Sequence, residues 1–434
     1  MSPFSTQISL RISSLTEEDR SLLERSLVAS LDLRLMPLLI LFFILNFLDR
    51  QNIASARLAN IERDLSLVGT QYQTCVSILF VGYIIMQVPS NLILGQIKRP
   101  GWYLCGCMAA WGTISACTGA VQNFHGLLVC RFLLGFFESA FFPGAIVKLA
   151  LRTACVFSPI YNTILSDQLG NAFGGLIAIG ILNLDGHLGI AGWRWLFLIE
   201  GSATVIVAGL GALVLPGLPS SDTHLTPEER DLAVWRLRED FGDAHFTPST
   251  SRLDGFRLAV WDPKTWFLCA ILFFTFVAAA VTNFFPSVVN TLGYSRNITL
   301  LLTAPPYLLC CAVLPYYHPI IDHGGANILA ATTTAIAARY VAMMLMPSSF
   351  YSASTVTLAW ISQIINQPPM KRAAAIALIN AISNTSNIWT SYLYIGPPRY
   401  LLALSVNGIA ATIAMMAAVG LRRYLAHEDK RIAL

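Results

Sequence analysis

The chain of 434 residues is strongly apolar, because 55% of it is Ala, Val, Ile, Leu, Met, Phe, Trp, Tyr or Cys and only 12% is charged. A soluble protein carries about 25% charged residues, so this composition excludes a water-exposed surface, and it also excludes disordered, collagen-like and disulfide-rich chains. The net charge of +4 is too small to indicate a nucleic-acid-binding surface. The sequence therefore predicts an integral membrane protein.

The first 34 residues form a polar N-terminal tail that carries four arginines and several carboxylates. No long apolar run lies within or before this tail, so the pattern of a cleavable signal peptide is not present in it. We expect residues 1–34 to lie in the cytosol.

Twelve windows of about 20 apolar residues follow, each long enough to cross a bilayer core of about 30 Å as a helix. They lie at 35–54, 73–95, 102–121, 125–148, 160–183, 194–215, 266–288, 298–317, 325–346, 349–366, 373–394 and 400–421. We therefore predict an all-α membrane protein with an N-terminal six-helix half at 35–216, a cytosolic connector at 217–265, a C-terminal six-helix half at 266–421 and a cytosolic tail at 422–434. Within the connector, the segment Thr226-Pro227-Glu228-Glu229-Arg230 is typical of a helix start.

The orientation follows from Lys and Arg, which are in excess in cytosolic loops. With the N-terminus inside, the inner segments hold 20 of the 28 basic residues, the outer loops hold five, and Arg50, Arg131 and Arg339 fall within spans. The loop between spans eight and nine is discordant, because it should be cytosolic and holds none. The bias supports an even number of spans with both ends in the cytosol.

Two six-helix halves joined by a polar connector are typical of transporters whose halves rock about a site near the membrane midplane. Channels and membrane enzymes can also have twelve spans, but the sequence has no His-rich metal box, no nucleophile elbow and no phosphate loop. The seven histidines are scattered and the nine cysteines lack zinc or redox spacing. We predict a transporter that is not an enzyme and holds no metal or cofactor.

Charged residues inside spans are candidate functional residues, because an ionised side chain at the bilayer centre costs roughly 3 kcal/mol. Asp49 and Arg50 are adjacent in span one and point about 100° apart, so each needs its own partner. In span four, Arg131 and Glu138 lie on one face but about 10 Å apart along the axis. The simplest arrangement sets Asp49 against Arg131 and lets the long side chain of Arg50 reach Glu138.

Such a cluster of charges can couple the transport of an anion to the transport of protons. A guanidinium binds a carboxylate with two parallel hydrogen bonds, which makes Arg50 the best candidate for the substrate carboxylate and Arg131 a second. A carboxylate close to such an arginine can take up a proton when substrate occupies the arginine, which assigns proton coupling to Asp49 and Glu138. An ion-pair network that only locks the helices together is the alternative. For Asp167 and Glu200 we favour structural hydrogen bonding near the membrane face.

Uncharged polar pairs also lie one turn apart on two spans: Tyr83 with Gln87 on span two, and Asn380 with Asn384 on span eleven. Each pair suits the lining of a cavity, and each equally suits a hydrogen bond between helices. We include Tyr83, Asn380 and Asn384 among the candidate substrate-binding residues.

Eight ordered blocks between about residues 25 and 425 resemble the fungal allantoate-permease family, which belongs to the anion:cation symporters of the major facilitator superfamily. They are Leu31-Asp32-Leu33-Arg34-Leu35-Met36-Pro37, Leu48-Asp49-Arg50-Gln51-Asn52-Ile53, Val88-Pro89-Ser90-Asn91, Arg131-Phe132-Leu133-Leu134-Gly135 with Glu138 and Pro143, Trp193-Arg194-Trp195-Leu196-Phe197 with Glu200-Gly201, Ala359-Trp360-Ile361-Ser362, Lys371-Arg372-Ala373-Ala374 and Pro398-Arg399-Tyr400.

This resemblance implies a twelve-helix major facilitator fold and proton-coupled uptake of a small carboxylate, such as allantoate, ureidosuccinate, nicotinate, pantothenate or biotin, by a monomer in the plasma membrane. In related anion symporters, residues that look like Asp49, Arg50, Arg131 and Glu138 here carry coupling and substrate binding. A tyrosine of those relatives matches Tyr83, and a substrate-contacting asparagine matches Asn380 or Asn384.

The sequence is shorter than the family pattern after Gly144 and around residues 318–327. Export of a fungal secondary metabolite by the same fold is therefore kept as an alternative to uptake, and so is an inactive or receptor-like member of the family.

Overall fold

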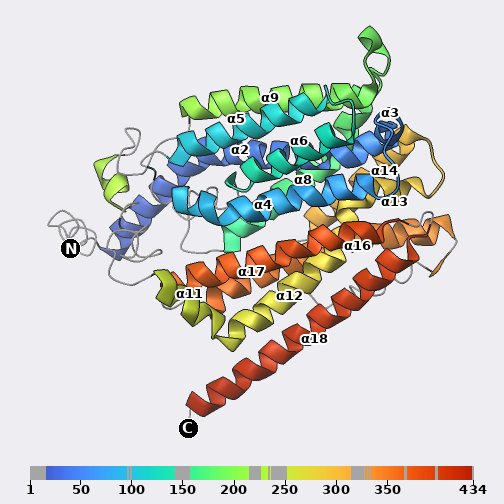
Figure 1. Cartoon of the computed structure of the whole chain (residues 1–434). Helices are drawn as coiled ribbons and strands as arrows, with labels where there is room; N and C mark the ends of the chain where they lie inside the picture. The colour runs from blue at the N-terminus through green and yellow to red at the C-terminus, as the bar shows by residue number, and fades with distance from the viewer. Residues whose placement is uncertain are drawn as a thin grey trace.

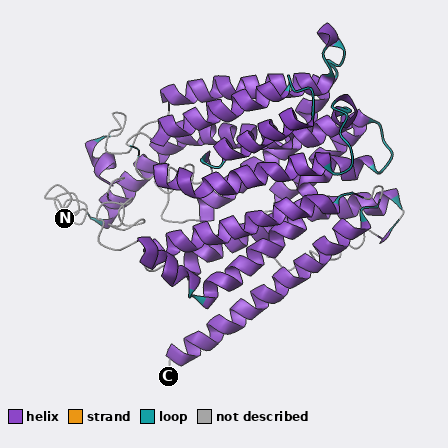
Figure 2. Ribbon diagram, in the orientation of Figure 1, coloured by secondary structure: helices purple, strands orange, loops and turns teal. Residues whose placement is uncertain are grey.

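The structure is a computed structural model that describes residues 16–94, 97, 100–141, 157–214, 226–232, 235, 252–313, 327, 330, 332–333, 335–365, 369–395 and 399–432. Helices make up nearly all of this described part, which contains no strand (Figure 2). The long helices run roughly along one direction as two groups, and the start of α2 and the end of α18 lie at the same end of the bundle (Figure 1). We refer to this end as the cytosolic end, following the predicted orientation, and to the opposite end as the outer end.

The described part of the N-terminal half contains six long helices and two short ones. They are α2 (Glu17–Leu58), α3 (Ile61–Asp64), α4 (Gln71–Leu94), α5 (Pro100–Thr118), α6 (Phe124–Glu138), α8 (Phe157–Leu182), η1 (His187–Gly189) and α9 (Gly192–Val214). Within this half, α2 packs against α8 and α9, α4 packs against α6, and α5 packs against α9. The described part of the C-terminal half contains α11 (Arg252–Val260), α12 (Pro263–Ala279), η4 (Ala280–Phe284), α13 (Phe285–Asn290), α14 (Arg296–Val313), α16 (Ile336–Ile364), α17 (Pro369–Thr390), η5 (Ser391–Leu393) and α18 (Leu401–Ile432).

Helix α2 extends far beyond the first predicted span, because its helix begins 18 residues before Leu35. Its N-terminus is capped by the side chain of Thr16, which accepts a hydrogen bond from the backbone N–H of Asp19 at 3.2 Å. The apolar window marks only the part of α2 that spans the bilayer core, whereas the helix itself also includes residues of the polar tail. Among the described helices, four stretches are both long and apolar enough to cross a membrane: Pro37–Leu58, Gly192–Val214, Pro263–Asn290 and Leu401–Glu428.

The predicted break between spans nine and ten is wrong, because α16 runs without interruption from Ile336 to Ile364 and includes Pro347. Proline ends most helices in water, but membrane bundles tolerate it where neighbouring groups satisfy the freed backbone. Much of the first part of the predicted ninth span, residues 325–335, and the shortened segment around residues 318–327 lie outside the described residues. The shortened segment after Gly144 also lies outside them.

The start of the connector helix agrees with its sequence pattern. The side chain of Glu229 accepts a hydrogen bond from the backbone N–H of Thr226 at 3.0 Å, and the hydroxyl of Thr226 accepts one from the N–H of Glu229 at 3.3 Å. The other oxygen of the Glu229 carboxylate accepts a hydrogen bond from the hydroxyl of Ser26 on α2 at 2.6 Å. Residues 226–232 therefore dock against the cytosolic extension of α2.

The two halves share an apolar core at the outer end. There the rings of Phe284 and Tyr394 stack at 4.6 Å, and Tyr72 of the N-terminal half meets Phe284 edge-on at 6.3 Å. Two hydrogen bonds link α4 to α17 and η5 in the same region: Ser77 donates to the carbonyl oxygen of Ile388 at 2.8 Å, and the hydroxyls of Thr74 and Tyr392 lie 3.1 Å apart.

At the cytosolic end, the buried residues that the structure describes form two separate apolar clusters, one in each half. The halves are thus joined at the outer end and have independent cores at the cytosolic end.

Candidate functional site

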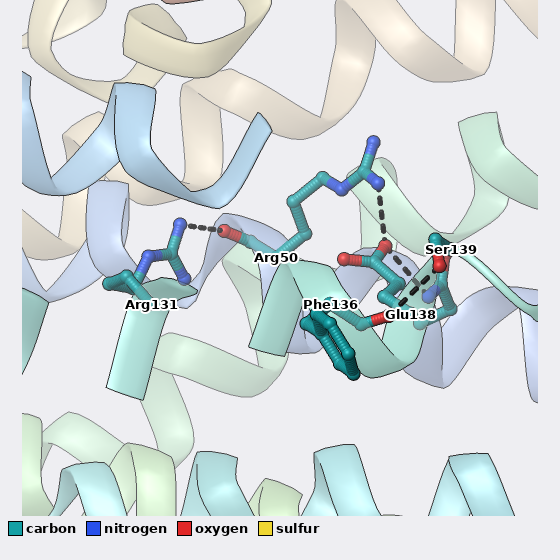
Figure 3. A network of polar contacts seen from close by, with 6 residues as sticks. Arg50, Arg131, Phe136, Glu138 and Ser139 are labelled. Atoms are coloured by element: carbon teal, nitrogen blue, oxygen red, sulfur yellow. Dashed lines mark hydrogen bonds and ion pairs between the residues drawn. The ribbon is translucent and has the colours of Figure 1, made fainter. Parts of the chain in front are cut away.

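An ion pair between α2 and α6 lies at the centre of the N-terminal half. The guanidinium Nη2 of Arg50 lies 2.7 Å from Oε1 of Glu138, and the side-chain amide of Asn46 donates to the same oxygen at 2.8 Å (Figure 3). Asn46 and Arg50 can share this partner because residues four apart lie on one face of a helix. The predicted contact between Arg50 and Glu138 is confirmed.

The pair is unevenly exposed. The side chain of Glu138 is only 3% exposed, whereas that of Arg50 is 21% exposed. Among the described residues, Oε2 of Glu138 and Nε of Arg50 have no hydrogen-bond partner. The arginine therefore keeps donor capacity for a ligand, while the carboxylate is shielded behind it.

Arg131 makes a different contact from the one predicted. Its Nη2 donates to the backbone carbonyl oxygen of Arg50 at 3.2 Å, and Arg50 lies between Arg131 and Glu138 in Figure 3. Arg131 is 3% exposed, so it is buried against the backbone of α2. A residue on α6 therefore holds the main chain at position 50, next to the side chain that pairs with Glu138.

Asp49 does not face Arg131, so the predicted pair between these residues is wrong. Its carboxylate instead accepts hydrogen bonds from Ser115 on α5 at 2.6 Å and from Thr204 on α9 at 2.8 Å, and it is 1% exposed. The reason is the angle of about 100° between adjacent helical residues, which turns Asp49 toward α5 and α9 when Arg50 turns toward α4 and α6. Glu200 on α9 lies within electrostatic range of Asp49 and is also buried.

Two glycines bring α4 and α6 close enough to form the site. A Cβ atom on Gly135 of α6 would collide with the carbonyl oxygen of Leu79, and one on Gly82 of α4 would collide with that of Phe132. These are backbone contacts that no side-chain rotation can relieve. Tight packing of α4 and α6 therefore sets the position of Tyr83, which follows Gly82, relative to Glu138.

Aromatic rings of α4 cover the Arg50 guanidinium. Its Cζ atom lies 5.6 Å from the ring centroid of Phe80 and 5.5 Å from that of Tyr83, distances at which a cation and an aromatic face attract. From the C-terminal half, Asn380 on α17 faces Tyr83, and Asn384 donates to the backbone and side-chain oxygens of Asn380 at 2.9 and 3.1 Å. The predicted residues Arg50, Tyr83, Asn380, Asn384 and Glu138 thus gather around one region between the halves.

Asp167 belongs to the same region, contrary to our expectation of a structural group near the membrane face. Its half-buried carboxylate lies within electrostatic range of both Arg50 and Glu138. Its Oδ1 atom is buried and has no hydrogen-bond partner among the described residues. Sequence reasoning placed Asp167 by its distance from the end of a predicted span. Gly170 and Gly174 lie on the face of α8 that packs against α2. Their spacing was the signal in the sequence that could have placed Asp167 near Arg50.

The glycine-rich stretch of α8 serves packing. Added Cβ atoms on Gly170 and Gly174 would meet Phe47 at 3.3 Å and Leu48 at 2.9 Å, so this stripe lies directly on α2. Gly170 and Gly174 also line a small cavity of about 30 Å³ together with Gln51, Asn52 and Asn171 among others. A cavity of this size holds one or two waters.

The arrangement can bind an anion and exchange a proton. A ligand carboxylate that takes the partly exposed guanidinium of Arg50 competes with Glu138 for it, and a buried carboxylate that loses its cation is stabilised by protonation. Within the described residues, no group of three or more His, Cys, Asp or Glu side chains is arranged to hold a metal ion.

Two helical halves that share a polar, partly exposed centre define the class of secondary membrane transporters. The family model of the Major Facilitator Superfamily matches residues 39–419, and the chain belongs to this superfamily. It is an MFS-type transporter and a multi-pass integral membrane protein.

Several fungal transporters are similar in sequence. An uncharacterized transporter of Schizosaccharomyces pombe is 28% identical over 98% of this chain and 87% of its own length. The MFS-type transporter efuF of Hormonema carpetanum is 31% identical over 66% of this chain and 58% of its own length. The high-affinity nicotinic acid transporter of Saccharomyces cerevisiae is 29% identical over 65% of this chain and 53% of its own length.

Solved structures share the fold at low sequence identity. The proton:xylose symporter XylE matches with a TM-score of 0.68 at 16% identity, covering 92% of this chain and 96% of that one. A bacterial homolog of the human lysosomal transporter Spinster, in an inward-facing and unoccupied conformation, matches with a TM-score of 0.64 at 16% identity and the same coverage. The predicted major facilitator fold is confirmed.

Proposed function

We propose that the protein imports a small organic anion together with protons across the plasma membrane, as a monomer of the allantoate-permease type. The observation that carries this proposal is the contact of 2.7 Å between Arg50 and Glu138, in which the arginine is partly exposed and the carboxylate is shielded. A substrate carboxylate can approach the guanidinium without first displacing a helix.

In this mechanism the substrate carboxylate binds Arg50 through its free donors. Glu138 then loses its cationic partner and takes up a proton, because an ionised carboxylate without a partner is costly in a buried site. When the substrate leaves toward the cytosol, Arg50 returns to Glu138 and the proton is released. Binding and protonation are thereby linked through one ion pair.

The other candidate residues have supporting roles in this proposal. Tyr83 and the Asn380-Asn384 pair contact the substrate body from two helices of opposite halves. Arg131 contributes to anion binding through the positive potential that it adds behind Arg50. Asp49, held by Ser115 and Thr204, is a second site for proton coupling next to α5 and α9.

One named relative supports a carboxylate substrate. The transporter from Saccharomyces cerevisiae that is 29% identical to this chain is named for nicotinic acid, a small carboxylic acid. Similarity at this level supports the class of substrate that we propose, and the identity of the anion is left to experiment.

The proposal is tested by uptake of radiolabelled nicotinate, pantothenate, allantoate and biotin into yeast that expresses the protein, with and without a protonophore. We expect one of these acids to accumulate, and the protonophore to abolish its accumulation. Cells that carry the empty vector provide the background. Absence of uptake by protein located at the plasma membrane would contradict import and favour export.

A further inference from the structure

The cytosolic end of the C-terminal half is strongly basic. Residues 252–264, 369–372 and 422–432 hold nine basic and four acidic residues there, an excess of five positive charges. Two of the four acids are already paired: Glu428 of α18 lies 2.7 Å from Lys264, and Asp262 lies 2.6 Å from Lys371. These two ion pairs join the cytosolic ends of α12, α17 and α18, and most of the other charged residues at this surface are basic.

Helix α18 directs basic residues away from the bundle. It lies at the edge of its group of helices in Figure 1. Leu421 and Leu425 belong to the apolar cluster that α12 shares, and Glu428 continues the same stripe toward α12. Arg423 and Lys430 are seven residues apart and about half a turn from that stripe, so both lie on the opposite face of α18. Both side chains are exposed.

This basic face begins at the depth of the lipid headgroups. The twelfth predicted span ends at residue 421, whereas α18 continues to Ile432, about 16 Å further along its axis. The headgroup layer is roughly 5–8 Å thick on each side of the hydrocarbon core. Arg423 therefore enters this layer, and Lys430 lies about 10 Å beyond Arg423, where its long side chain can reach back to the phosphates.

Large apolar side chains are exposed beside the basic face. On α11, Phe256 and Leu258 flank the exposed Arg257 and are themselves 49% and 50% exposed. Trp261, which follows α11, is 78% exposed, and Trp266 in the first turns of α12 is 48% exposed. Tryptophan is enriched at the boundary between lipid and water, and a short helix with exposed apolar and basic residues is typical of one that lies in that boundary.

The aromatic and basic residues share one depth. The ring of Phe267 on α12 lies 5.9 Å from the ring of Tyr424 on α18. Their chain neighbours Trp266 and Arg423 are therefore at similar depths on two adjacent helices. Helix α11 packs against both α12 and α17, which keeps Arg257 at the same end of the bundle.

We propose that Arg257, Trp261, Trp266, Arg423 and Lys430 form a binding surface for an anionic phospholipid of the cytosolic leaflet. The three basic side chains bind the negatively charged headgroup, and the two tryptophans pack against the glycerol and upper acyl region. Phosphatidylserine is the lipid of this chemistry that the cytosolic leaflet supplies. The choice of leaflet follows from the predicted orientation, and the inference does not depend on which substrate is transported.

The test compares two lipids with identical acyl chains, dioleoyl phosphatidylserine and dioleoyl phosphatidylcholine. Dissociation constants are measured for the purified, detergent-solubilised full chain by native mass spectrometry, which resolves each bound lipid. A basic residue near the membrane surface contributes roughly fivefold to the affinity for an anionic lipid. We therefore expect the wild-type protein to bind its first phosphatidylserine at least roughly tenfold more tightly than phosphatidylcholine.

The variant Arg257→Gln/Arg423→Gln should lose most of this preference, which should fall below about threefold because two of the three cations are removed. The matched control is Arg63→Gln/Arg399→Gln, which removes two exposed arginines from the outer end and the same amount of net charge. This control should keep the wild-type preference. Elution as a single symmetric peak verifies that each variant is folded.

Four outcomes would overturn the inference. Equal affinity of the wild-type protein for the two lipids would show that the headgroup charge is not recognised, and an unchanged preference in Arg257→Gln/Arg423→Gln would place the lipid elsewhere. Loss of the preference in the outer-end control would make it an effect of net charge alone. Displacement of phosphatidylserine by millimolar inorganic phosphate would identify a site for free phosphate instead of a lipid.

Discussion

The two halves of the molecule differ in where they hold charge. In the described part of the N-terminal half, six charged residue types lie within the bundle, namely Asp49, Arg50, Arg131, Glu138, Asp167 and Glu200. In α12, α14, α16 and α17 of the C-terminal half, charged residues lie only in the first turn, as Arg339 does in α16. Ion chemistry is therefore concentrated in one half.

The C-terminal half presents neutral polar groups instead. Asn283 donates to Asn387 at 3.2 Å, and the Asn407 amide lies 2.8 Å from the Tyr394 hydroxyl. Neutral hydrogen bonds are weaker than charged ones and are exchanged more readily. In the described residues, these contacts of the C-terminal half therefore involve no ion pair.

Of all the substitutions, Arg50→Ala should reduce substrate binding by the N-terminal half most severely. Removal of the guanidinium eliminates the cation for the substrate and leaves Glu138 without its partner, a loss of about 3 kcal/mol or more. We expect binding of any transported carboxylate to fall by at least two orders of magnitude, measured by calorimetry on purified protein. The control Arg422→Ala, at the exposed cytosolic end of α18, should bind normally. Retained affinity in Arg50→Ala would place the anion site elsewhere.

Glu138→Gln should separate binding from coupling. The amide keeps the shape of the side chain but takes up no proton, so exchange of labelled for unlabelled substrate should continue. Uphill accumulation in proteoliposomes with an imposed pH gradient should disappear. Glu62→Gln, a charge change at the outer surface, is the control that should still accumulate substrate. If Glu138→Gln concentrated substrate against a gradient, coupling would not depend on this residue.

Gly135→Ala should destabilise the N-terminal half. The added methyl group collides with the backbone of α4 at Leu79, and overpacking of this kind costs about 1–3 kcal/mol. We expect a lower melting temperature in detergent, measured by the fluorescence of a thiol-reactive dye. Gly106→Ala on α5 has no atom within 4 Å of the added carbon and should not lower the melting temperature. A similar melting temperature in both variants would contradict the close approach of α4 and α6.

Asn380→Ala should have a moderate effect that tests the role of the C-terminal half. Loss of one neutral hydrogen bond costs about 1 kcal/mol, so we expect KM to rise roughly fivefold. Proton-driven accumulation, measured as the ratio of internal to external substrate, should persist. A variant that bound normally but lost accumulation would show that the C-terminal half takes part in coupling.

The smallest effect should come from pH at the connector. Burial alone would raise the pKa of Glu229, but hydrogen bonds from Ser26 and Thr226 outweigh it and lower that pKa below its ordinary value of 4.5. The docked connector is therefore stabilised above pH 4.5 and loses this contribution as the pH falls through the lowered pKa. The contribution is below about 1 kcal/mol, as for other surface contacts.

Limited proteolysis checks this prediction. The connector of the wild-type protein should be cleaved faster at pH 3.5 than at pH 6 by an acid protease, after correction for the activity of the protease on an unfolded substrate. In Glu229→Gln the cleavage rate should depend less on pH. Equal pH dependence in the two proteins would rule out a role for Glu229 in docking.

The sequence predicted the ion pair of Arg50 with Glu138 but not the surroundings of Asp49. The partner of Arg50 could be predicted because its side chain is long and can contact Glu138 over a range of helix rotations. Asp49 is short, so its partner depends on the rotation of α2, which the pattern of apolar residues leaves undetermined. The hydroxyl groups of Ser115 and Thr204 carry no charge and therefore gave no signal in the sequence.

The sequence predicted helix limits well where contact with lipid alone determines them. The predicted limits were wrong where helix capping or packing within the bundle also acts. The apolar window of the first span omitted the cytosolic extension of α2, which Thr16 caps. Pro347 suggested a break that the bundle does not require. Asp167 was assigned to the membrane face because depth was counted from a span boundary, whereas the glycine stripe of α8 determines what it faces.

The contact of Arg131 with the carbonyl oxygen of Arg50 has a consequence for the evolution of this protein. Every residue type offers a backbone carbonyl at position 50, so the anchoring of α2 by Arg131 survives a change of the side chain there. The part of the scaffold that depends on Arg131 is therefore independent of the ion pair between Arg50 and Glu138. An arginine that held a side chain would have tied the two properties together.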